Sequence, residues 1–136
     1  SSILFFMGIL LAISALGSAG ILEKTALSLD ETFKDRRVIA VIIGAASSVI
    51  GNVSLVAASI KMYSLELIPL DSEFWNLLAF STGTGGSIFV IGSAAGIALM
   101  GLEKITFNWY FKNISFLAFI GFVTGILCYC IQTIIF

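Results

Sequence analysis

The chain has 136 residues, 59% of them hydrophobic and 11% charged, with a formal net charge of −1. Soluble domains are about 45–50% apolar and about 25% charged, so this composition predicts a membrane protein. The low net charge argues against a nucleic-acid partner. Because the chain has no histidine and no Asp or Glu inside an apolar run, Ser-His, Cys-His and intramembrane aspartyl catalysis are excluded, and we expect no enzyme and no cofactor.

Residues 3–22 form one uncharged apolar run. At 1.5 Å per residue, such a helix crosses a hydrocarbon core of roughly 30 Å, so we predict a transmembrane helix here. The next stretch, Glu23 to Arg37, holds eight of the fifteen charged residues. It is either a short amphipathic helix at the membrane interface, with Ser28 or Asp30 as N-cap, or a solvated loop.

Residues 38–66 contain two apolar stretches, 38–43 and 55–60, and between them lie the polar or small residues Ser47, Ser48, Gly51, Asn52 and Ser54. Two interpretations stay open. One is a single helix whose polar residues face a bundle. The other is a re-entrant hairpin that turns at Gly51-Asn52, with arms of about 12–14 residues, too short to cross the membrane. Ala40, Gly44 and Ser48 lie four apart and predict a smooth face for another helix.

Residues 74–102 are too long for a simple perpendicular span. In their middle lies a polar cluster, Thr82, Gly83, Thr84, Gly85, Gly86 and Ser87. Three glycines disfavour a continuous helix by roughly 3 kcal/mol relative to alanine. We therefore predict a helix that is unwound over Thr82–Gly86, followed by a half-helix that begins near Ser87 and packs tightly through Gly92 and Gly96.

Residues 103–113 are expected to form a loop, with Trp109 and Tyr110 at the membrane interface. Residues 114–136 form the last predicted transmembrane helix, with Gly121 and Gly125 on one face. Cys128 and Cys130 are two positions apart on this helix. Because such residues point to different sides, we expect neither a disulfide nor a metal site there.

The predicted fold class is therefore all-α integral membrane, with transmembrane helices, a re-entrant helical hairpin and a broken helix. The chain lacks an initial Met, and we expect it to be part of a longer protein that is embedded in a lipid bilayer. No charged residue lies within a span, so this chain supplies no titratable group at membrane depth for proton coupling.

The two polar clusters are the candidate solute site: Ser47, Ser48, Asn52, Ser54, Thr82, Gly83, Thr84, Gly85, Gly86 and Ser87. Hydroxyl, amide and freed carbonyl oxygens suit a hard cation such as sodium. The positive end of a half-helix near Ser87 suits an anion instead, such as a carboxylate or an oxyanion. In a third interpretation the same residues only connect helices in a non-transporting membrane subunit.

The block Phe80–Gly101, FSTGTGGSIFVIGSAAGIALMG, resembles the C-terminal part of NhaD-type sodium/proton antiporters of the ion transporter superfamily, and residues 2–11, 52–58, 101–105 and 109–110 fit too. The resemblance implies the C-terminal repeat of a multi-pass, inverted-repeat transporter in a bacterial inner membrane or its equivalent. The hairpin tip would be Val49–Ser54 and the helix break Thr82–Ser87, with the ion site between them. Sodium and proton would be the transported species, the N-terminal half of the protein would be the partner, and a homodimer stays open.

One motif departs from the family. The family's hairpin reads Asp-Asn-Val-Pro, whereas this chain has Gly51-Asn52-Val53-Ser54. The acid that Gly51 replaces is the obvious candidate for sodium or proton exchange. The resemblance therefore implies either a diverged or inactive member, or one that uses another coupling ion.

Overall fold

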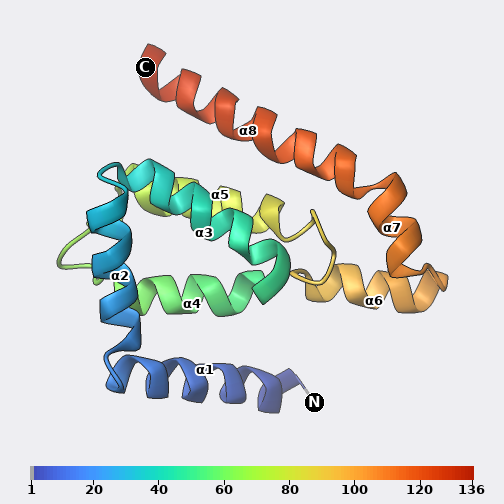
Figure 1. The fold of residues 1–136 in the computed structure, drawn as a ribbon, viewed down its shortest axis with the longest axis horizontal. Helices are drawn as coiled ribbons and strands as arrows, with labels where there is room; N and C mark the ends of the chain where they lie inside the picture. Colours follow the sequence, from blue (N-terminus) through green and yellow to red (C-terminus); the bar gives the residue numbers. More distant parts are fainter. Residues whose placement is uncertain (1) are drawn as a thin grey trace.

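The computed structural model describes residues 2–136, and every regular element within that range is a helix (Figure 1). The predicted all-α class is thus confirmed. The helices are α1 (Ser2–Ser18), α2 (Ile21–Thr32), α3 (Arg36–Ile50), α4 (Asn52–Met62), α5 (Glu73–Gly85), α6 (Ala94–Glu103), α7 (Phe107–Asn113) and α8 (Ser115–Ile135).

The first apolar run is shorter as a helix than predicted. α1 ends at Ser18 rather than at residue 22, and α2 continues at an angle of 71° to it. Gly20 makes the bend because its φ of 72° lies in the left-handed region, which glycine enters without a Cβ penalty. The charged stretch is helical up to Thr32, and Ser28 and Asp30 lie inside α2, so their assignment as N-caps is wrong.

The next helix begins after an acidic N-cap residue, Asp35. Asp35 precedes α3, and its carboxylate accepts a hydrogen bond of 2.9 Å from the backbone N–H of Arg37. The chain then reverses at Gly51, which has a φ of 100° and separates α3 from α4 (Figure 1). Of the two interpretations of residues 38–66, the structure has the hairpin shape, with its second arm ending at Met62.

The centre of the molecule is the contact between α3 and α5, which lie side by side (Figure 1). Its apolar core includes Ile39, Ala40 and Leu77, none of which is exposed to solvent. The predicted smooth face on α3 is confirmed. A Cβ on Gly44 would collide with the side chain of Ser81, and a Cβ on Gly85 would collide with the carbonyl oxygen of Gly44.

The predicted position of the helix break is wrong. α5 continues through Thr82, Gly83, Thr84 and Gly85, and the non-helical connection covers residues 86–93. Helical geometry brings Gly85 against α3, and this close contact offsets the weak helix propensity of the glycines. The second half-helix, α6, begins at Ala94 rather than near Ser87, with the hydroxyl of Ser93 as its cap.

The predicted tight packing of α6 on a neighbouring helix is also wrong within the described residues. None of the residues of α6 is buried there. A Cβ on Gly96 would meet Val90, within the preceding connection, and a Cβ on Gly92 would meet the end of α3. The two glycines therefore shape the connection and its contact with the hairpin rather than a helix pair.

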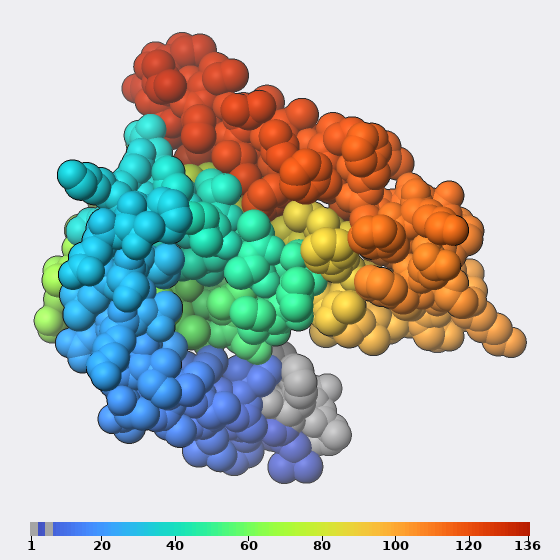
Figure 2. Space-filling view, viewed as in Figure 1, coloured from blue at the N-terminus to red at the C-terminus, as the bar shows by residue number. Residues whose placement is uncertain are grey.

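The C-terminal part of the chain forms an arm along one side of the core. Residues 107–113 are the short helix α7 rather than a loop, and α8 follows, seen in red across the top of Figure 2. Gly125 of α8 faces the ring of Phe80, whereas Gly121 has no neighbour within 4 Å. Both cysteines of α8 are free thiols, Cys128 exposed and Cys130 half-buried.

Within the described residues, α8 is long and apolar enough to cross a membrane, and the bent α1–α2 pair meets the same criteria when it is counted as one span. The exposed side of α8 consists largely of big apolar side chains, and Phe116 and Ile134 are 69% and 77% exposed. Large exposed apolar surfaces mark contacts with lipid or with other protein segments.

Candidate functional site

The hairpin tip and the connection between α5 and α6 meet at Gly92. The backbone N–H of Asn52 donates to the carbonyl of Gly92, and the N–H of Gly92 donates to the carbonyl of Ser48, both at 3.1 Å. Only a glycine fits here, because a Cβ would collide with the carbonyl of Ser47. The fold thereby joins the hairpin tip to the end of the connection that follows the second polar cluster.

The serines at the end of α3 are held inside the protein. Ser47 is fully buried, and its Oγ lies 2.6 Å from the carbonyl oxygen of Gly44 and 2.9 Å from that of Thr82 on α5. The Oγ of Ser48 donates to the carbonyl of Ala45 at 2.7 Å. A hydroxyl has one proton to donate, so both serines use it on backbone carbonyls. Ser47 thus links α3 to α5.

The threonines of α5 are engaged in the same way. The Oγ1 of Thr82 donates to the carbonyl of Leu78 at 2.7 Å, and that of Thr84 donates to the carbonyl of Phe80 at 2.8 Å. Bonds of this type, four residues back along a helix, satisfy a hydroxyl without a ligand. Gly83 is exposed, and a Cβ added to it would meet nothing within 4 Å outside its own helix turn.

The connection begins with one buried and one exposed residue. Gly86 is buried, and a Cβ on it would lie 3.3 Å from the carbonyl oxygen of Gly92. Ser87 is exposed, and its carbonyl accepts a 2.7 Å hydrogen bond from the hydroxyl of Tyr110 on α7. Burial raises the pKa of Tyr110 above its ordinary value.

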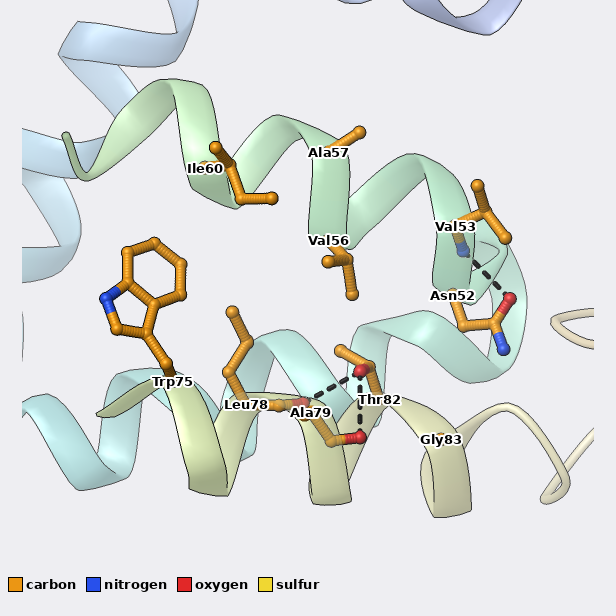
Figure 3. A pocket seen from close by; sticks show the side chains of 10 residues that line it. All are labelled: Asn52, Val53, Val56, Ala57, Ile60, Trp75, Leu78, Ala79, Thr82 and Gly83. Atoms are coloured by element: carbon orange, nitrogen blue, oxygen red, sulfur yellow. Dashed lines mark hydrogen bonds between the residues drawn. The ribbon is translucent and has the colours of Figure 1, made fainter. Parts of the chain in front are cut away.

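A groove of about 510 Å³ runs between α4 and α5 (Figure 3). Its lining residues are Asn52, Val53, Val56, Ala57, Ile60, Trp75, Leu78, Ala79, Thr82 and Gly83. Figure 3 shows Asn52, Thr82 and Gly83 toward one end and Trp75 and Ile60 toward the other. None of the ten carries an ionisable side chain, so the groove is apolar along most of its length with amide and backbone groups at one end.

A second, smaller hollow of about 140 Å³ lies at the hairpin tip. Ser54, Gly92 and Ile9 are among its lining residues, together with Asn52. Asn52 therefore borders both hollows. Its Oδ1 accepts a 2.8 Å hydrogen bond from the backbone N–H of Val53, which holds the amide in place at the start of α4 (Figure 3).

The nearest strong charge pair lies at the opposite end of α3 and α5. Arg37 and Glu73, near the starts of the two helices, form an ion pair of 2.7 Å and are both partly exposed. The hydrogen bond to Glu73 and its negative charge raise the pKa of Arg37. Among the described residues, no group of three or more His, Cys, Asp or Glu side chains could hold a metal ion.

Three residues of this arrangement were not among the predicted site residues. Gly44 and Gly92 make the close backbone contacts, and Tyr110 reaches the connection from α7. The small-residue spacing on α3 signalled Gly44. The spacing of Gly92 and Gly96 signalled close packing at Gly92 but not its partner at the end of α3, and nothing local distinguishes Tyr110 from an interfacial tyrosine. The partners of both residues lie more than 20 residues away along the chain.

The fold and the site define a helical protein in which the tip of a helical hairpin is bonded to an interrupted helix. Over 126 residues the chain is 54% identical to sodium/proton antiporter 1 and 52% identical to sodium/proton antiporter 2 of Arabidopsis thaliana. It is 31% identical over 127 residues to the Na(+)/H(+) antiporter NhaD of Alkalimonas amylolytica. The resemblance to NhaD-type sodium/proton antiporters is confirmed.

These alignments cover 92–93% of this chain but only 22%, 30% and 25% of the three relatives, so the chain spans less than a third of their length. No family model matches the chain. No solved structure matches it either.

Proposed function

We propose that this chain forms part of a multi-pass membrane transporter that moves sodium in exchange for protons. The similarity to proteins named sodium/proton antiporters, over nearly the whole chain, supports this proposal. The structural observation that carries it is the pair of backbone hydrogen bonds between Gly92 and the hairpin tip. They join a turn and a helix interruption, the two places where a buried backbone can offer oxygen atoms to an ion.

The structure favours Asn52 as the central ion-binding residue. It lies at this junction and borders both hollows, and its amide oxygen belongs to the class of ligand that hard cations prefer. In this proposal Ser54 and Gly83, which line the two hollows beside Asn52, also line the ion's path. Ser47, Ser48, Thr82 and Thr84 act behind them, by holding the helices together through bonds to backbone carbonyls.

Proton coupling in this proposal requires a titratable group from outside this chain. The groove has no ionisable lining residue, and Gly51 stands at the hairpin tip where the resembling family has an acid. A carrier needs a group that exchanges a proton within reach of the ion site. The relatives are more than three times as long as this chain. A complete protein of that length has room for such a group outside this chain.

The test uses the complete protein in membrane vesicles and measures proton movement on addition of sodium chloride or choline chloride. The wild type should respond to sodium only, and Asn52→Ala should abolish the response. Asn52→Asp keeps an oxygen that can cap Val53 but changes the charge at the site, so it should shift the half-saturating sodium concentration. Val49→Ala is the matched control and should retain transport, because Val49 lies just before the turn, is exposed and lines neither hollow.

Two outcomes would contradict the proposal. If Asn52→Ala transports sodium like the wild type, the site assignment is wrong. If the wild type responds equally to both salts, chloride or another anion drives the transport and sodium does not. A second variant, Gly83→Leu, adds a large side chain to the groove wall at a position with open space around it, and it should block transport while the protein still folds.

A further inference from the structure

Helix α7 contacts the connection between α5 and α6 at two neighbouring points. The hydroxyl of Tyr110 donates to the carbonyl of Ser87 at 2.7 Å. The ring of Phe111 stacks on that of Phe89, with a centroid distance of 5.9 Å and an angle of 9° between the ring planes. Phe107 in turn stacks on Phe111 at 6.2 Å. One short helix thus holds the connection by a directed hydrogen bond and by an aromatic contact.

The same connection is held at its other end by the hairpin tip, through the two hydrogen bonds of Gly92. Between these anchors lies Val90, which is 2% exposed and has a φ of 57°. A β-branched residue rarely adopts this left-handed conformation, which persists only where the surroundings hold it. The surroundings of Val90, between the anchors at Ser87–Phe89 and at Gly92, therefore hold the connection in this conformation.

We propose that Tyr110 is a positioning residue of the transporter, and that it holds residues 86–93 where Gly92 can bond to Asn52. This inference rests on the proposed function, because Asn52 is the residue whose position it controls. Tyr110 contacts the connection but lines neither hollow next to Asn52. Its effect on sodium therefore passes through the backbone from Ser87 to Gly92.

The test again uses the complete protein, with Tyr110→Phe, which removes only the hydroxyl, and Phe111→Leu, which removes the stacked ring. Two matched controls are Trp109→Phe, on the same helix, and Tyr129→Phe, whose hydroxyl lies 3.5 Å from the carbonyl of Glu73 on α5. The first measurement is the half-saturating sodium concentration in vesicles. Tyr110→Phe should raise it about two- to tenfold, the factor that corresponds to one lost hydrogen bond, and the controls should leave it unchanged.

The second measurement is amide hydrogen exchange of residues 86–93, which does not depend on transport. Tyr110→Phe and Phe111→Leu should accelerate exchange in this segment, whereas the two controls should match the wild type. A variant that only weakens folding would instead lower the amount of protein in the membrane and the maximal rate, with an unchanged half-saturating concentration.

The outcomes separate this inference from the proposed function. If the wild type moves sodium and Asn52→Ala abolishes transport, but Tyr110→Phe has the half-saturating concentration of the wild type, the positioning role is overturned and the proposed function stands. Unchanged exchange of residues 86–93 in Tyr110→Phe also overturns it. If the wild type moves no sodium, the proposed function and the positioning role are both overturned.

Discussion

Replacing Gly92 with alanine tests the junction on which the site depends. The new Cβ would collide with the carbonyl oxygen of Ser47, and it would lie 2.9 Å from the carbonyl carbon of Ser47 and 3.0 Å from that of Ser48. All three atoms belong to the backbone at the end of α3, so no side chain can rotate away. The connection and the hairpin tip must separate, and the hydrogen bonds of Gly92 to Ser48 and Asn52 lengthen or break.

The loss of stability in Gly92→Ala is the sum of the cost of the overpacked contact and the cost of the weakened hydrogen bonds. Overpacking a tight contact costs about 1–3 kcal/mol, and each hydrogen bond contributes about 0.5–1.5 kcal/mol net. The expected loss for Gly92→Ala is therefore about 2–6 kcal/mol. Because folded proteins are stable by only about 5–15 kcal/mol, such a loss is a large fraction of the total.

The assay is thermal unfolding of the complete protein in detergent, followed as the fraction that stays monodisperse after heating. Gly121→Ala is the matched control, since Gly121 lies in a helix with no neighbour within 4 Å and alanine is the better helix former. Gly92→Ala should lower the midpoint temperature by several degrees, and Gly121→Ala should not lower it. If the midpoint of Gly92→Ala equals that of the wild type, the close contact of Gly92 with α3 does not exist and the junction is wrong.

Three further predictions concern α5 and its neighbours. Gly83→Ala should stabilise the protein by up to about 1 kcal/mol, because Gly83 lies within a helix and has open space around it; a lower midpoint temperature would contradict a helical Gly83. Gly125→Ala should destabilise the protein by about 1–3 kcal/mol, because the new Cβ meets the ring of Phe80. Adding Phe80→Leu to this variant should restore the midpoint temperature; if it does not, the new Cβ meets some other group. Arg37→Gln should leave the midpoint unchanged at physiological salt, because the ion pair with Glu73 is partly exposed and screened; a clear drop would show that this pair matters for folding.

The site was predicted only in part, and the reason differs between its two halves. The turn at Gly51-Asn52 was one of two interpretations, because Gly-Asn permits a turn but does not require one. In the other half, the sequence predicts an unwound segment over Thr82–Gly86, yet Thr82 to Gly85 are helical. A group of glycines in a sequence is typical both of a broken helix and of a close contact between two helices. The propensity cost of about 1 kcal/mol per glycine is small enough for packing to decide.

The sequence by itself determined the helical class, the approximate extent of α8, and the small-residue face of α3 that includes Gly44. These features depend on apolar runs and on spacings of a few residues, and both are visible in a short stretch of sequence. Only the tertiary structure decided that α5 ends at Gly85, that Gly92 bonds to the hairpin tip and that Tyr110 reaches Ser87. Each of these is a contact between residues far apart along the chain, and its energy exists only once the helices have packed.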